Sequence, residues 1–241
     1  MKCSFTNDHY EYICKLIKKS PYRSIFFNDR YSKGEKILLL RHDIDQSPEK
    51  SLTLAEIEKK HGVKSTYFIW LTSPFYNIFE NHYSKILYEI MSLGHQIGLH
   101  FDERSYNIKN GRELNYHVNM EVELIERYFQ SKIYAVSMHK PSRWIIENDI
   151  KLDNYINTYS KKYLKDFKYI SDSRMEWREQ CICKTIESRI YNKLHVLIHP
   201  LSWSYKEISL DKKVIQFMAY KARKMDKDLS DNISVYERFF N

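Results

Sequence analysis

Ionisable side chains follow several short apolar segments of the sequence, each at the point where its segment ends. The carboxylates and imidazoles among them are Asp43, Asp45, His100, His139, Asp172 and His199. Together they would supply the donors of a metal site, and the remaining groups could act as an acid and a base. The sequence therefore predicts one metal-dependent catalytic site, provided that the fold brings these positions together.

Asp43 and Asp45 are separated by a single residue, so an extended backbone directs both carboxylates to one side and His42 to the other. Two carboxylates that close repel each other unless a cation or a proton lies between them. One of them could bind a metal ion while the other acts as a base. The alternative is that they cap a helix beginning at Pro48, although Ser47 already occupies the capping position.

The apolar segments that precede these residues are typical of buried strands, because each is bounded by charges or turn residues and is too short for a helix. They span residues 37–40, 66–71, 96–101, 133–138, 169–171 and 194–198. Amphipathic patterns predict helices near 10–19, 48–62, 86–94, 113–129 and 214–219. Such alternation favours βα units with a parallel sheet, either open or closed into a barrel. In a barrel, side chains at the carboxyl ends of the strands meet on one face.

The length of 241 residues and the absence of repeats or Pro/Gly-rich linkers predict a single domain over residues 1–241. Residues 141–161 show no regular pattern and predict a long loop, a kind of segment that is often functional. Cys181 and Cys183 lie two apart with no second pair nearby. We therefore expect no metal site among the four cysteines, and we expect them to be reduced and buried.

The chain carries 39 Lys and Arg against 31 Asp and Glu, a net charge of +8 with neutral histidines. This surplus favours an anionic partner, but the lysines are scattered and no nucleic-acid-binding motif is visible. We therefore expect a solvated basic surface and no nucleic-acid partner; a nucleic-acid-binding module is the weakest alternative. No apolar stretch reaches the ~18 residues of a membrane span, and charges interrupt the first twenty residues. A cytoplasmic protein without a membrane span is expected.

The residues at the segment ends resemble motifs of the polysaccharide deacetylase family, also called NodB-homology or carbohydrate esterase family 4. The likeness is closest to the divergent branch whose first motif reads His-Asp-Val-Asp. It rests on LLRHDIDQSP (39–48), GHQIGLHF (94–101), SMHKPS (137–142), YISDS (169–173) and LIHP (197–200). The resemblance implies a distorted (β/α) barrel with about seven parallel strands and metal-dependent removal of N-acetyl groups from amino sugars.

The resemblance also implies roles for the acid and base. By position, Asp43 matches the family's catalytic base and His199 matches its general acid. Asp172 is similar in placement to the acidic group that orients the acid histidine.

The metal ligands follow the family pattern with two departures. His100 matches the first histidine ligand. The metal-binding aspartate normally follows the base directly, but Ile44 intervenes here and Asp45 takes that role. The second histidine ligand normally comes four residues after the first, a position that Arg104 occupies. By its place at a strand end, His139 is the nearest substitute.

These assignments give a one-metal hydrolase with Asp45, His100 and His139 as ligands, and zinc as the expected divalent ion, although iron, cobalt and nickel also suit this donor set. Arg41, Trp177 and Trp203 are the predicted substrate-binding residues. The aromatic rings could stack on sugars or, equally, close the barrel mouth.

The expected substrate is an amino-sugar precursor of a surface polysaccharide, nucleotide- or lipid-linked, because family members that act on finished polymers are usually exported. The alternative is a catalytically silent carbohydrate-binding protein on the same barrel. Arg104 favours that alternative, because a guanidinium beside a divalent cation would be repelled.

Overall fold

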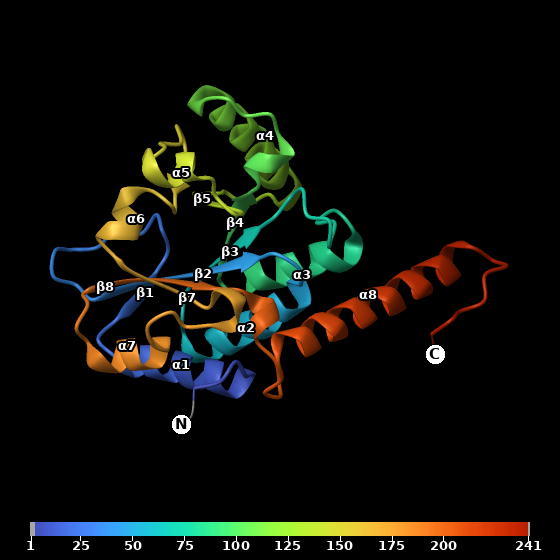
Figure 1. Cartoon of the computed structure of the whole chain (residues 1–241), viewed down its shortest axis with the longest axis horizontal. Coiled ribbons are helices and arrows are strands. Elements are labelled where there is room, and N and C mark those ends of the chain that lie inside the picture. Colours follow the sequence, from blue (N-terminus) through green and yellow to red (C-terminus); the bar gives the residue numbers. More distant parts are fainter. Residues whose placement is uncertain (1–2, 241) are drawn as a thin grey trace.

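A curved sheet of parallel strands forms the centre of the protein in this computed structural model, which describes residues 3–240. Along the sheet the strand order is β6-β5-β4-β3-β2-β8-β7, and β1 pairs with β2 outside this path. Seven parallel strands curl through 221° into a half-barrel with helices around it (Figure 1). The predicted distorted (β/α) barrel with about seven parallel strands is confirmed.

The strands are short, and most of their residues are buried. They are β1 (Arg23–Ile25), β2 (Ile37–Ile44), β3 (Thr66–Ile69), β4 (Gln96–Phe101), β5 (Ala135–Met138), β6 (Ile156–Asn157), β7 (Lys168–Ser171) and β8 (Lys193–Ile198). Each predicted strand overlaps one of them. The sequence pattern does not indicate β1 and β6, which have only three and two residues.

The central strand β2 is longer than its apolar segment, because it continues through three polar residues. All eight of its residues are buried, including Arg41, His42 and Asp43. Each of these polar side chains has a buried hydrogen-bonding partner, which offsets the cost of removing it from water. Asp43 therefore lies within the strand, where it pairs with Phe68 of β3.

Helices connect the strands, with short 3-10 turns after some of them. The helices are α1 (Asn7–Lys19), α2 (Pro48–His61), α3 (Asn81–Ser92), α4 (Gly111–Phe129), α5 (Arg143–Glu147), α6 (Lys161–Lys165), α7 (Ile182–Ser188) and α8 (Leu210–Asn232), and the turns are η1 (Glu103–Ser105), η2 (Ser173–Met175) and η3 (Pro200–Ser202). Helix α2 begins as predicted, because the Ser47 side chain accepts a hydrogen bond from the Lys50 N–H and Pro48 takes the first position. It ends at Gly62, whose φ of 70° suits glycine.

The prediction of an irregular loop over residues 141–161 was wrong in part. Helix α5 begins after Ser142, whose side chain accepts a hydrogen bond from the Ile145 N–H. Strand β6 then pairs with β5 at the edge of the sheet, and the Asn157 side chain donates to the Ile150 carbonyl. Elements this short depend on tertiary contacts, so no periodic pattern marks them.

Helix α8 extends away from the sheet, and the chain after it turns back along its outer end (Figure 1). The Asp226 carboxylate fastens this return, because it accepts hydrogen bonds from the backbone N–H groups of Phe239 and Phe240 and from the Tyr236 hydroxyl. Among residues 3–240, no helix combines the length and apolar character needed to cross a membrane.

Candidate active site

The three predicted metal ligands meet at the carboxyl ends of β2, β4 and β5. His100 Nε2 lies 3.0 Å from Asp45 Oδ1 and 3.0 Å from His139 Nδ1, and the latter two atoms are 3.1 Å apart. All three residues have little exposed surface, and Asp45 is the most accessible of them. The curl of the sheet and the pairing of β4 with β5, in which His100 lies opposite Ser137, bring these positions together.

The donor set suits a divalent ion. Two imidazole nitrogens and one carboxylate oxygen are the ligands of several catalytic zinc and iron sites. A point equidistant from three atoms 3.0–3.1 Å apart is nearer to each than the usual zinc–nitrogen or zinc–oxygen bond of about 2.0–2.2 Å. Asp45, His100 and His139 would therefore hold such an ion through three protein ligands, as catalytic zinc sites do.

Ser137 prepares His100 for this role. Its hydroxyl lies 3.1 Å from Asp43 Oδ1 and 3.0 Å from His100 Nδ1. The ionised carboxylate can only accept, so the hydroxyl donates its proton to Asp43 and accepts from the Nδ1–H of His100. The Nε2 lone pair of His100 is then free for a metal ion, an arrangement common around metal-bound histidines.

Trp70 orients the other histidine. The His139 ring stacks on the Trp70 indole with ring centroids 3.9 Å apart and an angle of 24° between the planes. The backbone N–H of His139 donates to the Phe101 carbonyl at 2.7 Å. These two contacts fix the ring so that its Nδ1 faces Asp45 and His100.

Asp43 lies next to His100 of this triangle and forms a buried ion pair with Arg41. The guanidinium donates two hydrogen bonds to the carboxylate, Nε to Oδ1 at 3.1 Å and Nη2 to Oδ2 at 2.8 Å. Burial raises the pKa of Asp43, but the charge of Arg41 and its hydrogen bonds lower it further, so the net shift is downward. Asp43 is therefore ionised over the whole physiological range.

Arg41 was predicted to bind the substrate, but the residue is fully buried in this structure. Its side chain has no exposed surface, and the guanidinium also donates to the Thr158 hydroxyl at 2.8 Å and the Tyr159 hydroxyl at 3.0 Å. In this structure Arg41 orients Asp43 and cannot touch a ligand.

His199 and Asp172 form a second pair next to the triangle, at the ends of β8 and β7. The Nδ1–H of His199 donates to Asp172 Oδ1 at 2.7 Å, and the backbone N–H of His199 donates to the same carboxylate. Burial lowers the pKa of His199, but the contact with Asp172 outweighs it and raises the pKa to about 9. His199 is therefore protonated at neutral pH, with 21% of its side chain exposed.

Trp203 also belongs to this pair, which corrects its expected role in substrate binding. Its indole N–H donates to Asp172 Oδ2 at 2.9 Å, and the residue is fully buried. Trp177 is partly buried, and its ring stacks on Phe5 with centroids 5.7 Å apart. The contacts of Trp203 belong to the packing behind Asp172, whereas a role of the partly exposed Trp177 in substrate binding stays a prediction.

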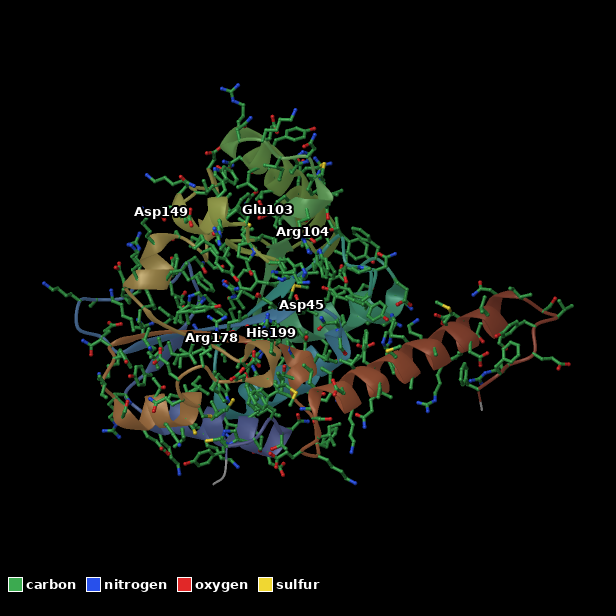
Figure 2. All side chains as sticks on the ribbon, viewed as in Figure 1. Asp45, Glu103, Arg104, Asp149, Arg178 and His199 are labelled. Atoms are coloured by element: carbon green, nitrogen blue, oxygen red, sulfur yellow. The ribbon has the colours of Figure 1, made fainter. Side chains whose placement is uncertain are left out.

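Arg104, which stands where the family has a histidine, is paired with a neighbour. Its guanidinium donates to both carboxylate oxygens of Asp102, at 2.8 and 2.7 Å, and about half of its side chain is exposed. Figure 2 labels Arg104 together with Asp45 and His199. Because Asp102 compensates its charge, we expect Arg104 to oppose a cation at the triangle only weakly.

Among the supporting residues, the sequence offered a signal for Ser137 alone. It lies two positions before His139 in a predicted strand, so alternation places both side chains on one face. Trp70 and Thr158 lie outside the motifs, and nothing local connects them with the site. His42 lies on the opposite side of β2, as alternation predicts, and its Nε2 contacts Glu58 Oε1 at 2.6 Å.

Neither a protein-family model nor a curated protein matches this chain. Among solved structures, it is similar to a CE4 family pseudoenzyme from Bacillus anthracis, with 17% identity and a TM-score of 0.48 over 83% of this chain and 66% of that one. It is also similar to the catalytic domain of a peptidoglycan N-acetylglucosamine deacetylase from Eubacterium rectale, with 17% identity and a TM-score of 0.47 over 80% and 87% of the two chains.

A third match is the chitin deacetylase from the fungal pathogen Colletotrichum lindemuthianum, with 15% identity and a TM-score of 0.46 over 83% of this chain and 86% of that one. This chain spans just under two thirds of the length of the Bacillus anthracis pseudoenzyme. The descriptions of these three proteins fall within the family that the sequence motifs resemble.

Proposed function

We propose that this chain is a metal-dependent hydrolase that removes the N-acetyl group from an amino sugar. The observation that carries the proposal is the meeting of Asp45, His100 and His139 beside two groups in opposite protonation states, the carboxylate Asp43 and the imidazolium His199. Amide hydrolysis needs these parts: a proton acceptor for water and a proton donor for the departing amine. The sequence motifs supply the choice of an acetylated amino sugar.

A divalent ion bound by Asp45, His100 and His139 would supply Lewis-acid chemistry, polarising the acetamide carbonyl and lowering the pKa of water. Asp43 accepts the proton of the attacking water, because it is the buried carboxylate nearest His100 that binds no metal in this assignment. Arg41 and Ser137 keep that carboxylate in one orientation. An ordered base of this kind avoids the cost of reorganisation during the reaction.

His199 provides the proton for the leaving amine. Its Nδ1–H is bonded to Asp172, so its Nε2–H is the proton available to the substrate. An unprotonated amine is a poor leaving group, and donation to the nitrogen makes the breaking of the C–N bond favourable. Loss of that proton leaves a neutral imidazole, which takes a proton from solvent before the next cycle, while the Nδ1–H stays bonded to Asp172.

The proposed substrate class is an anionic precursor, a nucleotide- or lipid-linked N-acetylated amino sugar of a surface polysaccharide. The net charge of +8 supports this choice, because it raises the encounter rate with phosphates. The proposal also includes zinc as the ion and a cytoplasmic location.

The test is metal content and amine release by protein purified without a histidine tag. The probes are UDP-N-acetylglucosamine and chitin oligosaccharides, and the variants are Asp45→Ala and, as a matched control, Asp211→Ala, which replaces an exposed aspartate in α8. We expect the first variant to lose about one equivalent of metal and all amine release, and the control to keep both. Wild-type protein that binds these sugars without metal and releases no amine would instead be the silent carbohydrate-binding alternative.

A further inference from the structure

A second group of metal-ligand side chains lies apart from the candidate active site, where the N-terminal segment meets α7. The potential ligand atoms of Cys3, His9, Cys181 and Cys183 all lie within 4.8 Å of one another. Cys3 Sγ is 3.6 Å from Cys183 Sγ, and His9 Nε2 is 3.2 Å from Cys181 Sγ. All three cysteines are free thiols.

This cluster bears on the expectation of no metal site among the four cysteines, because three of them lie close to a histidine. Cys181 and Cys183 do form a lone pair in the sequence, but folding brings Cys3 and His9 to them across more than 170 residues. The expectation of burial holds for Cys14, Cys181 and Cys183, whereas Cys3 is only partly buried.

We propose that these four side chains bind a structural zinc ion that fastens the N-terminal segment to α7. Three thiolates and one imidazole form one of the ordinary ligand sets of structural zinc sites. All four coordination positions would be taken by protein atoms, so the site would have no place for substrate. This distinguishes it from the triangle of Asp45, His100 and His139, which offers three ligands.

The distances suit tetrahedral coordination. Zinc–sulfur bonds of about 2.3 Å and zinc–nitrogen bonds of about 2.0–2.1 Å place tetrahedral ligand atoms roughly 3.5–3.8 Å apart. Two of the pairs here are 3.6 and 3.2 Å apart, and all separations stay within 4.8 Å. Small side-chain rotations would therefore bring all four atoms to bonding distance, with no movement of the helices.

The charges also favour a cation at this place. The three thiols and the His9 imidazole lie within 4.8 Å of one another. Full deprotonation of the group would bring like charges together, which is favourable only around a cation. Zinc binding would release the thiol protons and leave a net charge of −1, next to the cation of Lys184.

A series of contacts links the cluster to the pair of Asp172 and His199. The N-terminal segment joins the chain after β8 through the Asn7 N–H, which donates to the Ser204 carbonyl at 2.8 Å. Phe5, which lies between Cys3 and Asn7 in the sequence, packs edge-on against Trp203 with ring centroids 5.4 Å apart. The Trp203 indole in turn donates to Asp172. Zinc at the cluster would therefore stabilise the layer that supports the proposed acid, without contacting the substrate.

The experiment measures metal per chain by plasma mass spectrometry on full-length, tag-free protein purified in the presence of zinc and a non-chelating reductant. We compare the wild type with Cys183→Ser, with Asp45→Ala and with Cys14→Ala, a buried thiol of α1 outside the cluster. We expect two equivalents in the wild type and in Cys14→Ala, and one in each of the other two variants. The Asp45→Ala result reports on the active-site proposal alone, so the two proposals can fail separately.

A second measurement does not depend on the folding of any variant. Wild-type protein is stripped with a chelator and reloaded with Co²⁺, and its near-ultraviolet spectrum is recorded. Thiolate ligands give an intense sulfur-to-cobalt charge-transfer band, which the active-site triangle cannot give because it contains no sulfur. Absence of the band, metal content in Cys183→Ser equal to that of the wild type, or a Cys3–Cys183 disulfide in the intact mass would each overturn the proposal.

Discussion

Replacement of Asp172 by Asn tests the proposed acid by removing a charge and little else. Asp172 is fully buried, and it accepts hydrogen bonds from the His199 ring, the His199 backbone and the Trp203 indole. Burial lowers the pKa of His199, and the aspartate raises it to about 9 from an ordinary 6.5. The asparagine side chain has nearly the same shape but no negative charge, so it should remove most of that elevation.

The expected effect on rate follows from the fraction of protonated His199. With a pKa of about 9, His199 is almost entirely protonated at pH 7.5. With an ordinary pKa of about 6.5, only about a tenth of the molecules carry the proton at that pH. The rate of Asp172→Asn should therefore fall at least about tenfold at pH 7.5, and part of the loss should be recovered near pH 5.5.

The assay is the pH dependence of kcat/KM for amine release from chitin oligosaccharides or UDP-N-acetylglucosamine, together with an NMR titration of His199. The basic limb of the wild-type profile should lie near pH 9, and in Asp172→Asn it should move down by about two units. Asp149→Asn, in which an aspartate away from the pair is changed, should keep the wild-type profile. Superimposable profiles for Asp172→Asn and the wild type would refute the assignment of His199 as the acid.

The same pair should make stability depend on pH in a defined direction. The pKa of His199 is higher in the folded state, so its contribution is complete below the unfolded pKa of about 6.5 and is lost as the pH rises through 9. A shift of about 2.5 units corresponds to roughly 3 kcal/mol at 1.36 kcal/mol per unit. Urea unfolding should therefore show Asp172→Asn to be much less stable than the wild type at pH 6, with a smaller difference at pH 9.5.

Three further variants test the neighbouring residues. Asp43→Asn should keep its metal, measured by mass spectrometry, and lose amine release, because the amide is not a base; undiminished turnover would remove that assignment. Glu58→Gln should lower the free energy of unfolding by about 1–3 kcal/mol in urea titrations, because the buried carboxylate accepts from Ser65 and Tyr67 and an amide nitrogen cannot accept, and a loss below about 0.5 kcal/mol would contradict this. Arg104→Ala should change metal content little, since Asp102 already compensates the guanidinium; a gain of an equivalent would show that Arg104 excludes the ion.

The positions of the proposed metal ligands could be predicted from the sequence because the information is local. Each strand is marked by a short apolar segment, and parallel strands bring their carboxyl ends to one face. Asp45, His100 and His139 therefore meet without any knowledge of long-range contacts. The start of α2 is local for the same reason, since Ser47 and Pro48 act within one helical turn.

The roles of Arg41 and Trp203 could not be predicted, because they depend on distant partners. Arg41 follows an apolar segment and looks like a residue at the mouth of the barrel. Its burial is possible only because Thr158 and Tyr159, about 117 residues later, accept its remaining donors. Trp203 is likewise buried by its contact with Asp172 across 31 residues.

The cluster of Cys3, His9, Cys181 and Cys183 shows the same limit in the candidate metal sites. Motif spacing finds ligands that are neighbours in the sequence, such as the two cysteines of α7 and its N-cap. It misses ligands that only the packing of α1 against α7 brings together. The triangle of Asp45, His100 and His139 could be predicted, because the sequence predicts the parallel strands whose ends hold these residues.

The most direct test of the central claim is anomalous diffraction from a crystal of tag-free protein, recorded above and below the absorption edge of the metal found by mass spectrometry. We predict a peak within bonding distance of Asp45 Oδ1, His100 Nε2 and His139 Nδ1. A metal-replete crystal with no peak at that position, or with these three side chains turned away from one another, would contradict the account of the site.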